Sequence, residues 1–324
     1  MSKNTIFFGI DISKDVFDVT DSNDNYRQFT NNYNGFRNFL KLVDDSSHCV
    51  MEATGYYHYQ LAYFLQENSI KVSVENPLSV KRFIQMKLSK IKTDKSDSKM
   101  ICAYGVYSDL KLWQGHSKQQ QECLQITRLI NTYTKQCTML KNKIHGENVL
   151  GVPSKLVLGS LKRGLRQLQK EIVNLESHLL KLVKVNYQDL LSRLETIPGI
   201  GRKTAIMLIV LTDGFERFKT ASELCSYSGL TPIIRQSGSS VNGRARISKI
   251  GNKKLRNLLF MCSFNACKYN KTCKAIYDRI VAKGKSKKLA LMAVCNKLLK
   301  QAFAIAKSGL VYDQNYKSVL VREA

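Results

Sequence analysis

The order of short strands and helices in residues 1–90 limits the fold more than any other feature of the sequence. Alternating apolar residues predict strands, and apolar residues at helical spacing predict helices. The expected strands are residues 6–12, 16–20, 26–30, 49–51 and 71–74, and the expected helices are residues 36–43, residues 58–66 and one opened by Pro77. Asp- and Asn-containing turns join the first strands. The predicted order is therefore three strands followed by alternating helices and strands.

This order is the connectivity of the ribonuclease H-like fold, in which the first strand, the fourth strand and a later helix bring acidic side chains to one sheet edge. The acids that fall on these elements are Asp11, Glu52, Asp94 and Asp97. The last two are three residues apart and share a helix face. Carboxylate oxygens suit Mg²⁺, and paired ions assist phosphodiester displacement at both the attacking and the leaving oxygen. The sequence therefore predicts a magnesium site.

The same N-terminal motif leaves one other fold open. An actin-like sugar kinase also begins with Gly-Ile-Asp after a strand, as Gly9 to Asp11 do here. That fold requires glycine-rich phosphate loops later in the chain, and we find none in the second half of the sequence. Other acids near Asp11 are interpreted as turn or surface residues, namely Asp15, Asp18, Asp21 and Asp24.

Positive charge is concentrated after residue 100. The chain has 324 residues and a formal charge of +26, which is long enough for two or more domains. Residues 1–100 hold 13 Lys and Arg against 12 Asp and Glu, whereas the remainder holds 38 against 13. A near-neutral region that carries the acids and a strongly basic body predict a polyanionic partner, with nucleic acid as the first candidate. The alternative is a basic surface without a partner.

Two long helices are expected between residues 113 and 190. Apolar residues there repeat with alternating spacings of four and three, which is typical of a coiled-coil seam. One seam contains Ile126, Ile130, Tyr133, Cys137, Leu140 and Ile144, and the other contains Leu161, Leu165, Leu168, Ile172, Leu175, Leu179 and Leu182. Gly151 and Pro153 break the run, so two helices are predicted. They would pack on each other, on another subunit, or on both.

A glycine-rich turn follows at residues 197–201 and leads into an apolar helix. Gly199 and Gly201 flank Ile200, and Arg202 and Lys203 come directly after them. This pattern is typical of the hairpin in a helix-hairpin-helix module, where backbone N–H groups at a helix start bind phosphate without reading sequence. The alternative is an ordinary helix connection that contains glycine.

Residues 228–251 combine small hydroxyl residues with cations. The cations are Arg235, Arg244, Arg246 and Lys249, and the central serines are Ser237, Ser239 and Ser240. A serine hydroxyl can attack a phosphodiester when nearby positive charge offsets the developing negative charge. The alternative is a flexible basic loop that binds backbone phosphate. Chemistry alone does not distinguish the three serines.

Cysteine spacing and hydropathy give no sign of secretion or of a membrane span. None of the nine cysteines forms a Cys-x-x-Cys pair, so most are expected to be buried thiols in a reducing compartment. The group Cys262, Cys267 and Cys273 lacks metal-site spacing, and no cofactor is inferred there. The N-terminal apolar run is too short for a signal peptide, and Thr204–Leu211 is too short to cross a bilayer. We therefore expect a cytoplasmic protein associated with the nucleoid.

Five motifs, in order, resemble the DEDD transposases of bridge-RNA-guided insertion sequences. They are Phe8-Gly9-Ile10-Asp11, Met51-Glu52-Ala53-Thr54-Gly55, Lys92-Thr93-Asp94-Lys95-Ser96-Asp97, Ile197-Pro198-Gly199-Ile200-Gly201, and Gly229-Leu230-Thr231-Pro232 followed by Gln236-Ser237-Gly238. The resemblance spans nearly the whole chain. It implies a RuvC-like domain that supplies the acids, a long helical region for assembly, and a C-terminal transposase domain with a nucleophilic serine at Ser237.

The resemblance also implies partners and a mechanism. A structured guide RNA would pair with donor and target DNA, while the protein holds duplex shape and backbone. The active site would combine the acidic domain of one subunit with the serine domain of another in a dimer or tetramer. Trp113 and the cysteine group receive no role from the resemblance. Two other functions remain possible from the residues alone, which are a metal-dependent junction resolvase that uses water and a non-catalytic nucleic-acid scaffold.

We therefore predict an α/β plus α protein with three regions. Residues 1–112 form the RuvC-like acidic domain, residues 113–190 form the coiled-coil assembly region, and residues 191–324 form a mostly helical transposase domain with the helix-hairpin-helix and the serine loop.

Overall fold

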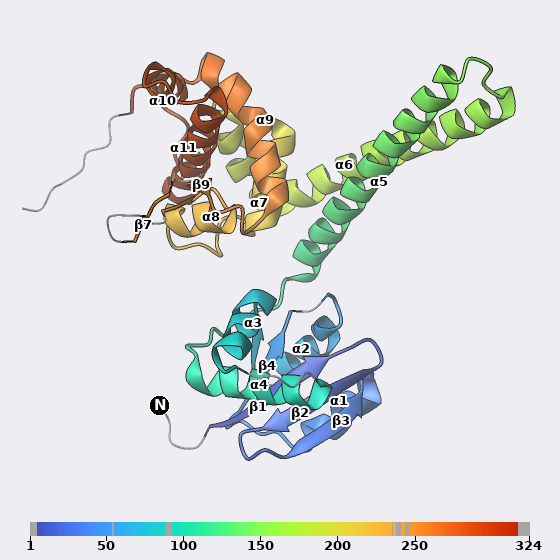
Figure 1. Cartoon of the computed structure of the whole chain (residues 1–324), viewed down its shortest axis with the longest axis vertical. Helices are drawn as coiled ribbons and strands as arrows, with labels where there is room; N and C mark the ends of the chain where they lie inside the picture. The colour runs from blue at the N-terminus through green and yellow to red at the C-terminus, as the bar shows by residue number, and fades with distance from the viewer. Residues whose placement is uncertain are drawn as a thin grey trace, which may run out of the picture. The chain divides into compact units, whose positions relative to one another are not determined.

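The computed structural model divides the chain into two compact units, Met1–His116 and Ser117–Ala324. It describes residues 5–53, 55–88, 93–234, 236–237, 241–243 and 246–316. The first unit is mixed α/β, and the second is mostly helical (Figure 1). The long helices and the C-terminal helices lie together in the second unit, so the separate limits 113–190 and 191–324 stay a prediction.

The first unit is built on a five-stranded sheet with the order β3-β2-β1-β4-β5. The strands are β1 (Ile6–Ile12), β2 (Val16–Asp21), β3 (Tyr26–Thr30), β4 (Ser47–Glu52) and β5 (Lys71–Glu75). The first three strands are antiparallel neighbours, whereas β4 runs parallel to both β1 and β5. This mixed sheet confirms the predicted order of strands and is consistent with a ribonuclease H-like domain.

Helices cover both faces of this sheet. On one face, α1 (Tyr33–Leu40) and α2 (His58–Glu67) pack on the inward side chains of β1 and β2, including Phe8, Ile10 and Phe17. On the other face, α3 (Pro77–Met86) and α4 (Asp94–Tyr107) pack around Val50 and Ile101. The alternation of β1 explains this arrangement, because Phe8 and Ile10 point to one face while Phe7 and Gly9 point to the other.

Helix α4 approaches β1 very closely at Gly9. A Cβ atom added at Gly9 would lie 2.1 Å from the backbone nitrogen of Cys102 and 2.2 Å from the carbonyl oxygen of Ser98. Both atoms belong to the α4 backbone, so no side-chain rotation can relieve the clash. Glycine at this position therefore allows α4 to lie directly on the central strand, with its first turn beside the end of β1.

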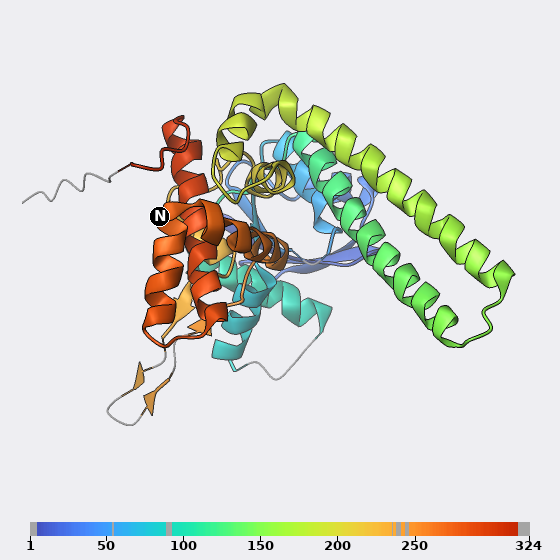
Figure 2. The same cartoon turned by 90° about the horizontal axis from the view of Figure 1, so that it is seen from above.

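Two long helices, α5 (Lys118–Val149) and α6 (Lys155–Glu195), begin the second unit. They lie side by side and are joined by a short connection at Gly151 and Pro153, as predicted (Figure 2). The seam residues Ile126, Ile130 and Leu179 are buried, which confirms that the two helices pack on each other. Seam residues nearer the connection, such as Leu161 and Leu165, are only half-buried. Packing against a partner subunit stays a prediction.

Five further helices lie in the described part of the second unit. They are α7 (Arg202–Thr212), α8 (Ala221–Tyr227), α9 (Lys253–Tyr269), α10 (Lys271–Ala282) and α11 (Lys287–Ser308). Their apolar side chains share one core with the adjacent ends of α5 and α6. Helix α11 is long and apolar enough to cross a membrane, although no membrane span was predicted. Its residues Val294, Leu298 and Leu299 lie fully buried in this core.

Eight of the nine cysteines are buried thiols, as expected.

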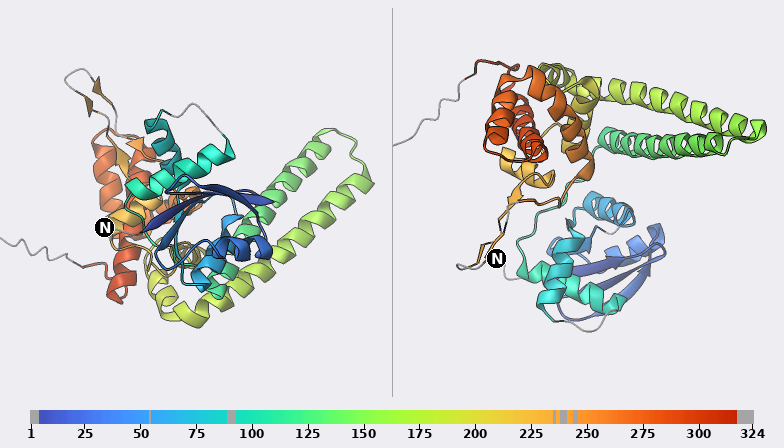
Figure 3. Two further views of the ribbon diagram at one scale, coloured as in Figure 1. Left: turned by 90° about the horizontal axis from the view of Figure 1, so that it is seen from below. Right: turned by 45° about the horizontal axis from the view of Figure 1, so that its top comes forward.

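The serine segment contains short strands where a loop was predicted. Strand β6 (Pro232–Ile233) pairs with β9 (Arg246–Ile247), and β7 (Gln236–Ser237) pairs with β8 (Val241–Asn242), both antiparallel. We call these four strands the serine ribbon, and its described part extends beyond the helices of the second unit (Figure 3). Two-residue ladders are too short to show an alternating pattern in the sequence.

Candidate active site

The four predicted acids lie on the three elements expected for them. Asp11 is near the end of β1, and Glu52 is the last residue of β4. Asp94 and Asp97 belong to the first turn of α4. Because β1 and β4 are parallel neighbours, their carboxyl ends meet at one edge of the sheet. The fold therefore directs acids from distant parts of the sequence to one place.

The sequence Thr93 to Asp97 starts the helix and supplies two of these acids. The Thr93 hydroxyl oxygen accepts a hydrogen bond from the Ser96 backbone N–H at 3.1 Å, and the Ser96 hydroxyl oxygen accepts one from the Thr93 N–H at 2.8 Å. This reciprocal capping box fixes where α4 begins. The acidic residues of the first turn also interact favourably with the helix dipole. Local sequence therefore sets the positions of both α4 carboxylates.

The electrostatics of Asp11 show that the acids interact. Burial is the largest cause of a raised pKa at the Asp11 carboxyl, and together with the negative charges of Asp97, Asp94 and Glu52 it brings that pKa to about 6. Like charges held together in this way repel each other, and a bound cation would relieve the repulsion. Within the described ranges, however, no three acidic, His or Cys side chains already converge to hold a metal ion.

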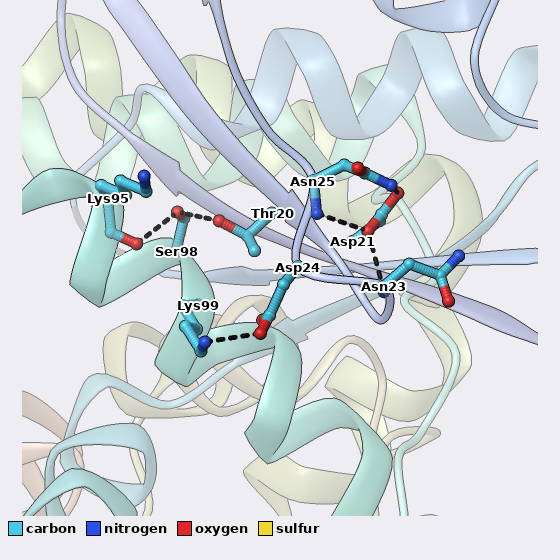
Figure 4. A network of polar contacts seen from close by, with 8 residues as sticks. All are labelled: Thr20, Asp21, Asn23, Asp24, Asn25, Lys95, Ser98 and Lys99. Carbon is cyan, nitrogen blue, oxygen red and sulfur yellow. Dashed lines mark hydrogen bonds and ion pairs between the residues drawn. The ribbon is translucent and has the colours of Figure 1, made fainter.

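Polar contacts from Ser98 and Lys99 hold the N-terminal part of α4 against β2 and the turn after it (Figure 4). The buried hydroxyls of Thr20 and Ser98 are 2.7 Å apart and share a hydrogen bond. Farther along α4, the Lys99 ammonium forms an ion pair of 2.7 Å with the Asp24 carboxylate. The Asp21 carboxylate accepts bonds from the backbone N–H groups of Asn23 and Asn25 and so shapes the turn itself. The prediction that Asp21 and Asp24 are turn residues is confirmed.

The prediction that Asp18 is a turn or surface residue is wrong. Asp18 is buried on β2, directly across from Asp11 on β1, whereas Asp15 is exposed as expected. Its carboxylate accepts hydrogen bonds from the Tyr26 hydroxyl at 2.5 Å and from the Gln28 amide nitrogen at 3.0 Å. The bond to Asp18 is the largest cause that, with burial and the Asp18 charge, raises the pKa of the Tyr26 phenol to about 12. The sequence does contain one sign of this burial. Asp18 lies within the apolar pattern of a strand, whereas the other three acids lie at or beyond the ends of that pattern.

The glycine-rich turn lies between α6 and α7, and its two glycines differ. Gly199 has a φ of +105°, and an added Cβ would lie 2.8 Å from the Ala266 side chain on α9. Gly199 therefore allows the turn to pack closely against α9, and it does not leave space for a phosphate to approach the backbone there. Gly201 is the N-cap residue of α7, lies exposed and provides no side-chain cap. The approach of a phosphate to the first backbone N–H groups of α7 is open at Gly201.

The cations after this turn form ion pairs with α6. The Arg202 guanidinium contacts the Glu195 carboxylate at 2.7 Å, and the Lys203 ammonium contacts the Glu176 carboxylate. Arg202 and Lys203 are largely exposed, whereas Glu195 and Glu176 are half-buried. Ion pairs of this kind contribute about 0–1 kcal/mol and exchange readily for another anion. A phosphate could therefore replace either glutamate as the partner.

The base of the serine ribbon is fixed between α8 and α9. The Asn252 backbone N–H donates to the Tyr227 carbonyl oxygen at 2.7 Å, and the Arg256 guanidinium donates to the Ser228 carbonyl oxygen at 2.7 Å. In β7, Ser237 pairs with Val241 of β8. Of the predicted cations, Arg246 lies on β9 of the same ribbon and Lys249 follows two residues after that strand, and both are exposed. The other predicted residues of this segment, Arg235, Arg244, Ser239 and Ser240, lie outside the described residues.

Comparison with known proteins identifies the family. Residues 8–150 match a transposase model of the DEDD type from IS110 elements, and residues 191–278 match the Transposase IS116/IS110/IS902 family. The chain is 31% identical over 331 residues to the pilin gene-inverting protein of Moraxella lacunata, and this alignment covers 97% of the chain and 99% of that protein. The chain belongs to the IS110-type transposases. It is therefore a DNA strand-transfer enzyme.

Two further relatives support the assignment. The pilin gene-inverting protein of Moraxella bovis is 30% identical, with 97% of the chain and 99% of that protein covered. The transposase for insertion sequence element IS1111A of Coxiella burnetii is 25% identical, with 79% of the chain and 76% of that protein covered. Membership of this family confirms the predicted resemblance and excludes the sugar-kinase and non-catalytic scaffold alternatives. All residues predicted for the site lie within the two matched regions.

Asp18 should affect strand transfer although it was not predicted as a site residue. We expect Asp18→Asn to lower the rate of strand transfer by about 10-fold to 100-fold, because outer carboxylates support the groups that bind a metal or a substrate. The matched control is Asp15→Asn, which removes the same charge from the exposed turn next to β2. Rates are compared at several Mg²⁺ concentrations. Equal rates for the two variants would show that Asp18 serves the fold alone.

Proposed function

We propose that this IS110-type transposase breaks and rejoins DNA with an acidic magnesium site and a serine nucleophile. The acids are Asp11, Glu52, Asp94 and Asp97 of a ribonuclease H-like, RuvC-like domain, and the nucleophile is Ser237 of the C-terminal transposase domain. The observation that carries the proposal is the convergence of β1, β4 and α4, which places three other acids near enough to act on Asp11.

The four acids fit a divalent cation by their chemistry. Each offers carboxylate oxygens, which are the ligands that Mg²⁺ prefers. Asp11, Glu52 and Asp97 are half-buried and Asp94 is exposed. A bound Mg²⁺ would supply positive charge to the phosphodiester oxygens. Without an ion, mutual repulsion favours the separated side chains.

In the proposed reaction, the Ser237 hydroxyl loses its proton and its oxygen attacks the phosphorus atom of a DNA phosphodiester. A phosphoserine bond forms, the bond between phosphorus and the departing sugar oxygen breaks, and that oxygen takes up a proton. Attack by a hydroxyl of the second DNA strand then reverses these events and releases the serine. Arg246 of the serine ribbon and Lys249 just after it support this assignment, because cations there would offset the charge on the phosphate.

We further propose that the second unit binds donor and target DNA together with a structured guide RNA. The charge supports this proposal, since residues after 100 hold 38 Lys and Arg against 13 Asp and Glu. The α6–α7 turn with Gly201, Arg202 and Lys203 would bind duplex backbone in the manner of a helix-hairpin-helix. The half-buried seam near the α5–α6 connection supports a homo-oligomer, a dimer or tetramer, in the cytoplasm.

Metal removal tests the proposal as a whole. The purified protein is incubated with donor DNA, target DNA and the RNA transcribed beside its gene, and recombined DNA is measured. We expect EDTA to abolish the product and excess Mg²⁺ to restore it, because strand transfer depends on a cation at the four acids. Binding of DNA to the basic second unit should survive EDTA, which serves as the control. Full recombination in EDTA would contradict the proposed magnesium site.

A further inference from the structure

A column of aromatic rings includes two tyrosines of α2 and ends at an exposed tyrosine four residues after Glu52 of the acidic site. The rings of Tyr56 and Tyr59 are stacked with centroids 6.4 Å apart, and those of Tyr59 and Tyr63 are stacked at 6.3 Å. The Tyr63 ring meets the Trp113 ring edge-on at 4.8 Å. We call these four residues the ring column. Tyr59 and Tyr63 are four residues apart on one side of α2, and Tyr56 lies just before the helix begins.

The inner end of the ring column is fixed. The Tyr63 hydroxyl accepts a hydrogen bond from the His116 backbone N–H at 2.9 Å and donates one to the His116 carbonyl oxygen at 3.2 Å. The Trp113 backbone N–H donates to the Val72 carbonyl oxygen of β5 at 2.7 Å. Trp113 also packs against the core of the first unit. The column is therefore a rigid support, and this support is a role for Trp113 that the sequence did not indicate.

The outer end of the column is open to solvent. Tyr56 is 62% exposed, and its neighbour Tyr57 is 46% exposed. Tyr56 follows Glu52 of the acidic site by four residues, after a turn in which Gly55 has a φ of +60°. Exposed rings in such a position resemble the platforms on which single-stranded nucleic acids stack their bases.

The near-neutral charge of the first unit gives a reason for a stacking contact with nucleic acid there. Residues 1–100 are nearly neutral, and their acids converge at the end of the sheet. Electrostatic attraction therefore contributes little to holding a DNA strand at this unit, unlike in the basic second unit. Stacking does not depend on net charge, and every base offers a flat face to a ring.

We propose that Tyr56, with Tyr57 beside it, stacks an unpaired base of the DNA strand whose phosphodiester lies at the four acids. The substrate of the acidic site is then a locally single-stranded DNA segment, since a base within duplex is already stacked on both faces. This inference rests on the proposed function, because it assumes that DNA is bound at these acids.

The experiment measures binding of the full chain to DNA that carries one 5-iodouracil in an unpaired stretch, in buffer without Mg²⁺ so that no cleavage occurs. We expect irradiation to cross-link the iodouracil to Tyr56 or Tyr57, as located by mass spectrometry. We expect Tyr56→Ala to weaken binding to the single strand by about 5-fold to 100-fold and Tyr56→Phe to restore it, because stacking requires the ring alone. Binding to the matching duplex should not change.

Tyr33→Ala is the matched control, because Tyr33 is 63% exposed on α1 of the same unit but lies outside the ring column. Wild-type binding by Tyr56→Ala, an equal loss in Tyr33→Ala, or an equal loss on duplex would overturn the proposal. A larger loss on an RNA strand than on a DNA strand would also overturn it in favour of the guide. Cross-linking to Tyr56 without any recombination activity would leave the stacking site standing and would count against the proposed reaction.

Discussion

Replacing Ser237 with alanine is expected to abolish the covalent bond between protein and DNA and, with it, recombination. Removal of an attacking hydroxyl leaves no route to the phosphoserine bond, so the rate should fall by more than about 1,000-fold. The assay uses labelled DNA with the wild-type protein and stops the reaction with denaturant. Labelled DNA that migrates with the denatured protein reports the adduct, and joined product reports strand transfer.

Ser248→Ala is the control for this substitution. Ser248 follows β9 at the base of the serine ribbon, and its hydroxyl contacts only the Ile250 carbonyl oxygen at 3.4 Å among the described residues. We expect this variant to form adduct like the wild type. If Ser237→Ala still forms the adduct and Ser239→Ala or Ser240→Ala does not, the nucleophile is Ser239 or Ser240 instead of Ser237. Cleaved DNA without any adduct in the wild type would favour the water-using, resolvase-like reaction.

Replacing Asp11 with asparagine is expected to stop catalysis without unfolding the first unit. Asparagine has the same shape but removes one of the charges that converge at the end of the sheet, so strand transfer should fall by more than about 100-fold through loss of metal binding. The charged form of Asp11 is disfavoured in the folded protein, as the raised pKa shows. Without Mg²⁺, the thermal unfolding temperature of the variant should therefore equal or exceed that of the wild type.

Asp45→Asn provides the comparison, because Asp45 is an exposed acid of the same unit and lies outside the acidic site. Its strand transfer and unfolding temperature should match those of the wild type. Both variants should still bind DNA through the second unit, as measured by gel shift. Near-normal strand transfer in Asp11→Asn would show that the four acids are not the catalytic centre.

The first unit was predictable because its signals are local. Alternating side chains in β1 and helical spacing in α2 predicted the element order, and the parallel pairing of β1 with β4 brings Asp11 and Glu52 to one edge. Asp18 was missed because a turn preference was applied to a residue inside a strand, and its burial depends on β3 and on the Tyr26 hydroxyl. The ring column was missed because Trp113 and Tyr63 are 50 positions apart in sequence.

The second unit was less predictable for physical reasons of its own. A coiled-coil seam in the sequence shows that a helix packs against another helix, but it does not identify that helix. From the sequence, α5 and α6 could equally have packed against helices of another chain. The role of Gly199 depends on Ala266 of α9, which no local pattern reveals. The serine ribbon forms from pairs of two-residue strands, and such short ladders leave no alternating pattern in the sequence.

The contact between Gly9 and α4 limits how this enzyme can be redesigned. Real Cβ contacts do not fall below 3.0 Å, so an alanine at residue 9 would push the α4 backbone outward by about 1 Å. Asp94 and Asp97 would move with it, and a displacement of about 1 Å at reacting groups can cost about 100-fold in rate. Engineers who alter the target preference of such a recombinase should therefore keep position 9 fixed, although it lies beneath a helix.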